Sequence, residues 1–193
     1  MDIQTDFLII GSGIAGLMVA LKVADRGTVA IVTKKQAVDS NTNLAQGGIA
    51  SVFDQQDSFD LHIQDTLDAG DGLCNPDVVR QVVVGGPERI RELMEIGVGF
   101  NTEGGGPGEN GSAPFDLGRE GGHSRNRIVH AHDMTGREVE QVLLERARQN
   151  RNIRFYENHM AIDLITFSTR IKRGLVTTTH EDYCCGAYVL DRE

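Results

Sequence analysis

"DFLIIGSGIAGLMVALKVADRGTVAIVTKK", residues 6–35, decides the fold of this chain. A continuous apolar run at 7–10 is followed by glycines, then by apolar residues at helical spacing, and then by a second apolar run at 29–32. This order predicts strand, turn, helix and strand. Both strands are apolar throughout, which is typical of parallel strands covered by helices. We therefore predict a right-handed βαβ unit, with Gly27 at the C-terminal end of its helix.

Three glycines lie between the first strand and the helix, with the spacing Gly11-x-Gly13-x-x-Gly16. In this context the first glycine permits a tight turn, and the second lets a pyrophosphate approach the backbone. The third lets helix and strand pack, and the phosphate rests on the helix N-terminus. The pattern predicts a dinucleotide site, with a plain βα turn as the alternative.

The end of the second strand departs from the usual dinucleotide pattern. The acidic residue that would hold the adenosine ribose is absent, because the strand runs into Thr33, Lys34 and Lys35 and the next acid is Asp39. A lysine there could meet the 2′-phosphate of NADP, or contact a flavin dinucleotide that is bound in another way. A solvated lysine pair at a strand end is the third interpretation.

A second glycine-bearing loop, "NTNLAQGGIASVF" at residues 41–53, follows the βαβ unit. Gly47 and Gly48 interrupt an otherwise apolar run, which predicts either a positive φ or the close approach of another group. Binding of a nicotinamide dinucleotide does not require such a loop. A flavin, in contrast, needs bare backbone near its reactive ring, so the loop favours a flavin.

The middle of the chain reads as mostly helical. Ser58 is placed to cap a helix that runs to about Ala69, and Pro76 opens another that reaches Ile96 with a break at 85–87. The glycine-rich segment 97–122 predicts a long loop, either a mobile flap or a disordered insertion.

The last third of the chain predicts one helix and then strands. Thr135 and Glu138 have the spacing of a capping box before a helix that ends near Asn150. Apolar runs at 153–156, 160–167 and 183–190 then read as strands, arranged as a meander. Only three residues follow the last strand, so we expect the chain to be part of a longer one.

Composition excludes several classes of protein. The 193 residues are 39% hydrophobic and 24% charged, which is ordinary for a folded domain, and no apolar stretch is long enough for a membrane helix. A net charge of -9 argues against a nucleic-acid surface. The N-terminus does not resemble a secretion signal, and three cysteines form no disulfide framework. We expect a cytoplasmic protein with small-molecule ligands and no nucleic-acid or membrane partner.

Three motifs together carry a family resemblance: "GSGIAGL", "SNTNLAQGGIA" and "REGGHSRNRIVHAHDMTGRE". With them the chain resembles the L-aspartate oxidase family, which is similar to the flavoprotein subunits of succinate dehydrogenase and fumarate reductase. The resemblance implies an α/β fold: a Rossmann-like FAD-binding parallel sheet with helices and a small antiparallel strand region, truncated before the capping domain. Residues 1–56 would form the βαβ unit and flavin loop, 57–150 a helical segment with the glycine-rich loop, and 151–193 strands.

Two positions discriminate within this superfamily. Many succinate dehydrogenase and fumarate reductase flavoproteins have a histidine that carries FAD covalently where this chain has Asn41, so the resemblance implies non-covalent FAD. Those enzymes have a glutamine where this chain has Glu120, which is the aspartate oxidase pattern. A carboxylate suits an amino diacid, because it can pair with the ammonium group that succinate lacks.

The resemblance also implies site residues and a reaction. The implied FAD contacts are Gly11, Ser12, Gly13, Ile14, Ala15, Gly16, Lys34, Asn41, Thr42, Asn43, Leu44, Ala45, Gln46, Gly47, Gly48 and the backbone near Ala161. Glu120 would be catalytic: it would orient the amine of L-aspartate and accept its proton while a hydride passes to the flavin, giving iminoaspartate. Electrons would pass to oxygen or fumarate, in de novo NAD biosynthesis, with functional coupling to quinolinate synthase.

Alternatives remain at each level. Glu120 could instead form a surface ion pair with Arg119. The chain could belong to a fumarate reductase or succinate dehydrogenase flavoprotein, or to a non-catalytic dinucleotide-binding module. The implied capping domain, which would supply substrate-binding arginine and histidine residues, is absent, so we expect this piece alone to be inactive and to hold FAD weakly.

The histidines of the third motif invite a metal interpretation. His130 and His132 would share a face of an extended segment, but no further ligands stand at a recognisable spacing, and we predict no metal. We expect His123 and His130 to form hydrogen bonds near the flavin or within the core.

Overall fold

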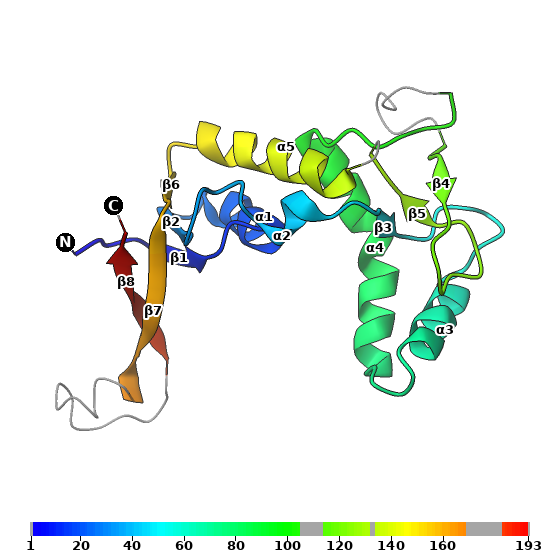
Figure 1. Cartoon of the computed structure of the whole chain (residues 1–193), viewed down its shortest axis with the longest axis horizontal. Helices are drawn as coiled ribbons and strands as arrows, with labels where there is room; N and C mark the ends of the chain where they lie inside the picture. Colours follow the sequence, from blue (N-terminus) through cyan, green and yellow to red (C-terminus); the bar gives the residue numbers. More distant parts are fainter. Residues whose placement is uncertain (1, 105–113, 132–133, 169–182, 193) are drawn as a thin grey trace. The chain divides into compact units, whose positions relative to one another are not determined.

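The computed structural model describes residues 2–104, 114–131, 134–168 and 183–192. The chain forms two compact units (Figure 1): unit 1 is drawn from residues 1–41 and 143–193, and unit 2 from residues 42–142. Unit 1 contains a parallel three-stranded sheet and an antiparallel pair of strands, and unit 2 contains an antiparallel three-stranded sheet.

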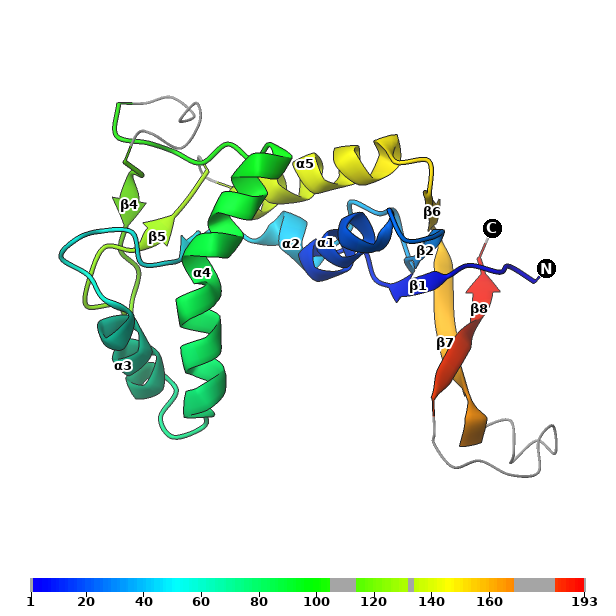
Figure 2. The same ribbon diagram turned by 180° about the vertical axis from the view of Figure 1, so that it is seen from behind.

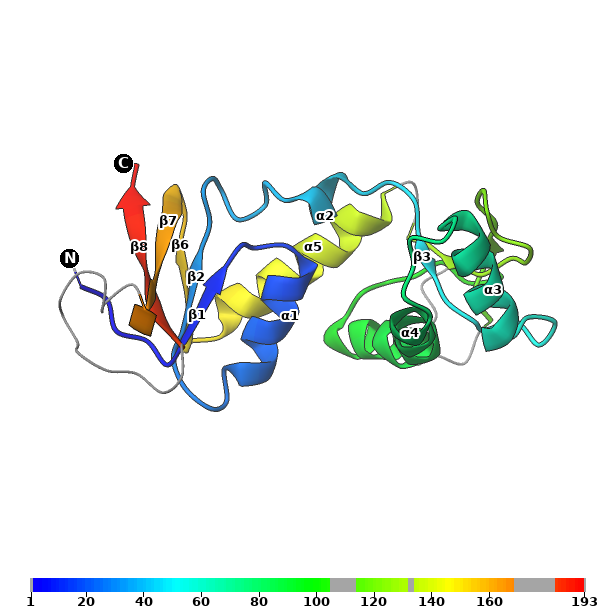
Figure 3. The same ribbon diagram turned by 90° about the horizontal axis from the view of Figure 1, so that it is seen from below.

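The parallel sheet of unit 1 has the order β1 (Phe7–Ile10), β2 (Val29–Val32), β6 (Ile153–Tyr156). Helix α1 (Ile14–Val23) joins β1 to β2 and lies against both strands (Figure 3), so the predicted βαβ unit is correct. The central strand β2 is buried at every position, as predicted. Strand β1 alternates between half-buried and exposed residues, so it is not covered on both faces.

The predicted meander is wrong for its first strand. Strand β6 pairs in parallel with β2, whereas β7 (His159–Thr166) and β8 (Cys184–Asp191) form a separate antiparallel pair. The reason is the helix α5 (Thr135–Gln149), which supplies the crossover that a parallel pairing requires. A turn with Asn158 at φ +57° then separates β6 from β7.

Gly27 does not end helix α1. The helix is capped by Ala24 in a right-handed conformation. An added Cβ at Gly27 would lie 2.6 Å from Oδ2 of Asp6, and the same oxygen accepts a 2.7 Å hydrogen bond from the Thr28 amide. The glycine therefore gives room to the Asp6 carboxylate at the start of the sheet.

Unit 2 contains the helices α3 (Phe59–Ala69) and α4 (Pro76–Ile96), which lie side by side (Figure 2). Its sheet has the order β3 (Ile49–Ala50), β5 (Ile128–Val129), β4 (Leu117–Gly118). The predicted start of α3 is correct, because the Ser58 hydroxyl accepts a 3.2 Å hydrogen bond from the Leu61 amide.

The predicted break in α4 is wrong, since the helix runs through 85–87 without interruption. Its buried residues are Val83, Pro87, Ile90 and Leu93, a spacing that forms one stripe only if the helix is continuous. Burial of this stripe offsets the hydrogen bond that Pro87 cannot donate. An added Cβ at Gly86 would lie 3.0 Å from Oγ of Ser51, so the small residue serves packing.

The segment that leads into α5 also differs from its prediction. The Thr135 hydroxyl accepts a 3.0 Å hydrogen bond from the Ala131 amide, and Glu138 accepts one of 3.4 Å from the Gly99 amide. Both side chains therefore bond to preceding segments, and the predicted capping box is wrong. In the glycine-rich segment, β4 is a strand rather than loop, while residues 105–113 lie outside the described residues.

Within the described ranges, no helix is both long enough and apolar enough to cross a membrane.

Candidate functional site

The glycine turn of unit 1 has the geometry that a dinucleotide requires. Gly11 has φ +106°, a conformation that other residues rarely adopt. An added Cβ at Gly16 would collide with the Gly11 carbonyl and lie 3.2 Å from Cγ2 of Ile9. Gly13 is the N-cap of α1, and no side chain caps that end of the helix. The positive end of α1 therefore faces a bare backbone turn, which suits a pyrophosphate.

Ser12 lies in this turn, but its side chain holds a neighbouring loop. The residue is 3% exposed, and its hydroxyl donates a 2.8 Å hydrogen bond to the Ala37 carbonyl. The Ala37 amide in turn donates to Oε1 of Glu157 at 2.8 Å. The predicted ligand contact at Ser12 would thus use the backbone, while its side chain fixes the loop that follows β2.

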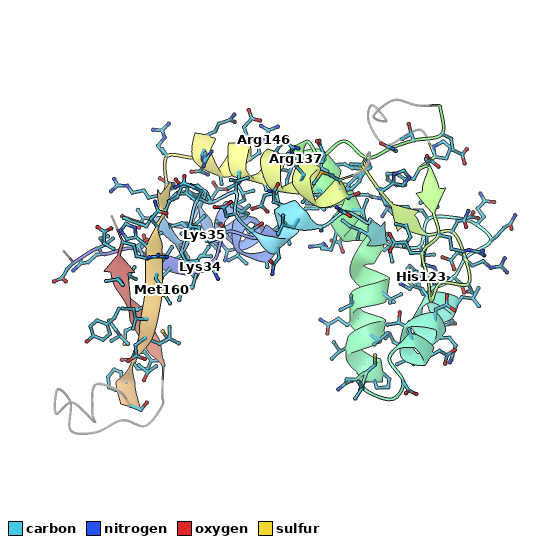
Figure 4. All side chains as sticks on the ribbon, viewed as in Figure 1. Lys34, Lys35, His123, Arg137, Arg146 and Met160 are labelled. Carbon is cyan, nitrogen blue, oxygen red and sulfur yellow. The ribbon has the colours of Figure 1, made fainter. Side chains whose placement is uncertain are left out.

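Lys34 lies on this loop and is exposed, just beyond the end of β2 (Figure 4). The backbone on either side of it is bonded to the start of β7: the His159 amide donates to the Thr33 carbonyl at 2.9 Å, and the Asn158 amide to the Lys35 carbonyl at 3.1 Å. Ala161, further along β7, stands where the pairing register with β8 shifts. Hydrogen bonds within unit 1, including one from the Ser12 hydroxyl, therefore connect the predicted contacts at Ser12, Lys34 and the β7 strand.

The predicted flavin loop begins with a short helix, α2 (Asn41–Leu44), rather than with irregular backbone. Asn41 belongs to unit 1, and the loop residues after it belong to unit 2. The Gly136 amide donates a 3.0 Å hydrogen bond to the Ala45 carbonyl, and an added Cβ at Gly136 would collide with the Thr42 carbonyl. The first turn of α5 therefore anchors the loop, whereas Leu44 is 70% exposed.

Gly47 and Gly48 have different neighbours, and neither has a positive φ. An added Cβ at Gly48 would collide with the Val129 carbonyl in β5. An added Cβ at Gly47 would lie 2.7 Å from Oε1 of Glu120. Of the two predicted reasons for the glycines, close approach is correct, and the approaching groups are parts of this chain.

Glu120 thus lies beside the predicted flavin loop inside unit 2, with an exposed side chain. Its carbonyl accepts a 3.3 Å hydrogen bond from the His123 amide, which closes a turn after β4. The alternative ion pair with Arg119 is not formed within the part of the chain that the structure describes.

A buried charged cluster, absent from the sequence predictions, lies next to this turn. Arg127 is fully buried and donates to both carboxylate oxygens of Asp57 at 2.8 and 2.7 Å. It also donates to Oδ2 of Asp65 at 2.6 Å, an oxygen that accepts further hydrogen bonds from the amide and hydroxyl of Ser124 at 2.8 Å. The Arg127 amide donates to the Gly118 carbonyl at 3.0 Å. The cluster therefore ties the turn that carries Glu120 to α3 and β5.

The cluster shifts the pKa values of its members. Burial raises the pKa of Asp65, but hydrogen bonds from Ser124 and Arg127 outweigh it and lower that pKa to about 2. Burial, followed by the charges of Arg127 and His123, lowers the pKa of His62. His62 and His123 make an edge-to-face contact, with ring centroids 5.6 Å apart. An arginine just before a buried strand was the sequence signal for this cluster, but its acidic partners lie more than fifty residues away.

The two described histidines of the third motif have separate partners. Nδ1 of His123 lies 3.2 Å from Nη1 of Arg127, and Nδ1 of His130 lies 3.3 Å from Nδ2 of Asn101. His132 lies outside the described residues. Both described histidines therefore form side-chain hydrogen bonds within unit 2, as expected.

The sequence profile of the FAD binding domain matches residues 6–191, almost the whole chain. The chain belongs to this FAD-binding domain family. FAD is thereby indicated as the cofactor, as predicted, and the uncapped helix end and bare glycine turn of unit 1 fit its pyrophosphate.

Curated relatives in this family carry the name predicted by the resemblance. The chain is 53% identical over 161 residues to "L-aspartate oxidase 2-b, chloroplastic" of Nicotiana tabacum, and the match covers 83% of this chain and 24% of that protein. It is 43% identical over 190 residues to L-aspartate oxidase of Pseudomonas aeruginosa, and this match covers 98% of this chain and 34% of that protein. The chain thus spans about a quarter to a third of the length of these relatives.

Solved structures support the predicted α/β class. A structure of the E. coli quinol fumarate reductase FrdA has a TM-score of 0.73 and 29% identity, with 84% of this chain and 27% of that chain covered. The resemblance to both the aspartate oxidase and the fumarate reductase families, stated from the motifs, is therefore correct.

Proposed function

We propose that the protein containing this chain is an FAD-dependent oxidoreductase that converts L-aspartate to iminoaspartate. The observation that carries the proposal is the position of Glu120, whose carboxylate lies against Gly47 of the flavin loop. Identities of 43% and 53% to proteins named L-aspartate oxidase support the choice of substrate. Bound FAD supplies the two-electron chemistry, as acceptor of a hydride.

The residues of unit 1 are assigned to the nucleotide part of FAD. The N-terminus of α1 and the turn from Gly11 to Gly16 would bind the pyrophosphate, since they offer backbone amides and a positive helix end. Lys34 is exposed at the end of β2 and would add a positive charge, while Ala161 would contribute backbone. The loop from Thr42 to Gly48 is assigned to the flavin ring.

Glu120 is proposed to bind the ammonium group of L-aspartate and to accept a proton from it. A carboxylate pairs with an ammonium through a short, charge-assisted hydrogen bond, and it also serves as a general base. The side chain is exposed, and no ion pair within the described ranges competes for it. A glutamine at this position would keep the shape but lose the charge.

Asn41 is proposed to leave FAD bound without a covalent link, because an amide side chain cannot form the bond that a histidine forms. Denaturation of the native protein in acid should therefore release the flavin into the supernatant. Yellow colour that stays with the precipitated protein would contradict this assignment.

The substrate is tested by the absorption spectrum of the native protein that contains this chain, before and after anaerobic L-aspartate. Bleaching by aspartate is expected, and Glu120→Gln should lower the rate of bleaching by about 100-fold or more, as for loss of a positioned base. Arg119→Gln is the matched control, expected to change the rate less than about threefold, as for an exposed charge. An unchanged rate in Glu120→Gln would remove the proposed role.

A fumarate reductase or succinate dehydrogenase flavoprotein is the second candidate, favoured by the TM-score of 0.73 to FrdA. It predicts bleaching by succinate rather than by aspartate.

For the aspartate-oxidising enzyme, we further propose that oxygen or fumarate accepts the electrons, and that the product passes to a quinolinate synthase in NAD biosynthesis. The plant relatives are named chloroplastic, so the predicted cytoplasmic location is tested by fractionation of the source cells.

A further inference from the structure

We propose that Gly47 is a positioning residue: its missing side chain leaves the space in which the Glu120 carboxylate lies against the flavin loop. The inference rests on the proposed function for the identity of the substrate. It assigns to Gly47 a role toward a neighbouring side chain as well as toward the cofactor.

The geometry beside Gly47 points to Glu120 as the nearest neighbour of a side chain at this position. The three atoms nearest to an added Cβ are Oε1, Cδ and Oε2 of Glu120, at 2.7, 3.4 and 3.5 Å. A real Cβ does not approach an oxygen as closely as the first of these distances, so any side chain at position 47 would displace the carboxylate. Backbone strain does not explain the glycine, because its φ is not positive.

The backbones on both sides of this contact are held by one strand. Ile49 of β3 pairs with Val129 of β5, and Gly118 of β4 pairs with Ile128 of β5. Gly47 and Glu120 each lie two residues from a paired position, and the His123 amide further holds the Glu120 carbonyl. The backbone separation between Gly47 and Glu120 is therefore set by the sheet of unit 2.

The Glu120 side chain is the part that can move. It is exposed, and a new methyl group at position 47 would be accommodated by rotation of its side-chain torsions rather than by a shift of the sheet. Gly47→Ala is thus expected to relocate the carboxylate while the fold is retained. Gly48→Ala is the contrasting change, because its methyl group would meet the β5 backbone.

The activity test is a double-mutant cycle in the native protein, with L-aspartate as substrate. Gly47→Ala should lower kcat/KM about 10- to 100-fold, as expected when a catalytic group is misplaced by about 1 Å. In the Glu120→Gln background the same change should cost less than about twofold, since the group it displaces is no longer a carboxylate. The thermal unfolding midpoint of Gly47→Ala should match that of the unmodified protein.

A second readout needs neither substrate nor turnover. In native protein labelled with 15N-glycine, the Gly47 amide resonance should move in Glu120→Gln and stay in place in Arg119→Gln. A Gly47 resonance that does not move in Glu120→Gln, or equal losses of kcat/KM from Gly47→Ala in both backgrounds, would overturn the inference. Absence of bleaching by aspartate, with the Gly47 resonance still moved by Glu120→Gln, would instead overturn the proposed substrate and leave the proposed contact between Gly47 and Glu120 standing.

Discussion

The glycine turn of unit 1 and the glycine loop of unit 2 use the same residue for different reasons. In the turn, Gly11 has φ +106° and Gly16 packs on the Gly11 carbonyl, so both requirements arise within six residues. In the loop, Gly48 packs on β5 and Gly47 on Glu120, partners that lie more than seventy residues away. Local backbone geometry determines the first region, and tertiary contacts determine the second.

This difference bears on how each region would respond to change. A turn whose conformation is determined by its own backbone is disrupted when its own residues are substituted. A loop determined by distant contacts also depends on whatever holds those contacts, which here is the buried cluster around Arg127. The predictions that follow separate these two kinds of dependence.

The largest effect is expected from Arg127→Ala, which should lower the free energy of unfolding by about 3–5 kcal/mol. The change leaves the carboxylates of Asp57 and Asp65, with 0% and 14% of their side chains exposed, without their cation. Urea denaturation measures the loss. Arg80→Ala is the control, because its pair with Asp60 is exposed at 63% and 85%, and it should cost less than about 1 kcal/mol. Equal losses in the two variants would contradict a structural role for the buried cluster.

An intermediate effect is expected in the turn of unit 1. Gly16→Ala should lower the free energy of unfolding by about 1–3 kcal/mol, because its methyl group meets backbone that cannot rotate away. It should also weaken FAD binding, measured as flavin retained after gel filtration.

Gly85→Ala should change the free energy of unfolding in the opposite direction to Gly16→Ala. Gly85 lies inside α4 with no atom within 4 Å of an added Cβ, so alanine should stabilise the protein by about 0.5–1 kcal/mol. Urea denaturation curves of Gly16→Ala and Gly85→Ala, measured together, test whether alanine has opposite effects on stability at these two glycines. A stable Gly16→Ala variant with full flavin would show that the turn tolerates a side chain.

The βαβ unit could be predicted from the sequence because its signals are local. Apolar runs, the three-glycine spacing and the helical period all lie within residues 6–35. The parallel pairing of β6 with β2 was not predicted, since an apolar run of four residues carries no information about its neighbour in the sheet. The continuity of α4 was missed for a related reason: a Gly-Gly-Pro sequence breaks an isolated helix, and only the buried stripe through Pro87 overrides it.

Part of the candidate site could be predicted in the same way. The motif resemblance singled out Glu120 and Gly47, but the contact between them needed the antiparallel sheet of unit 2. The acidic partners of Arg127 could not be predicted, because nothing in the sequence distinguishes the buried Asp57 and Asp65 from acids on the surface. Contacts between side chains that are remote in sequence therefore could not be predicted.

The smallest effect is a dependence of stability on pH, and it should come from unit 2. The pKa of His62 is lowered from 6.5, so the unfolded chain takes up a proton at a higher pH than the folded one. Stability is then complete above pH 6.5 and falls as the pH drops below it, whereas the lowered pKa of Asp65 acts only between 3.8 and about 2. His62→Gln should remove the first decline and keep the second, as measured by urea denaturation across both windows. A decline near pH 6.5 that persists in His62→Gln would show that a group other than His62 is responsible.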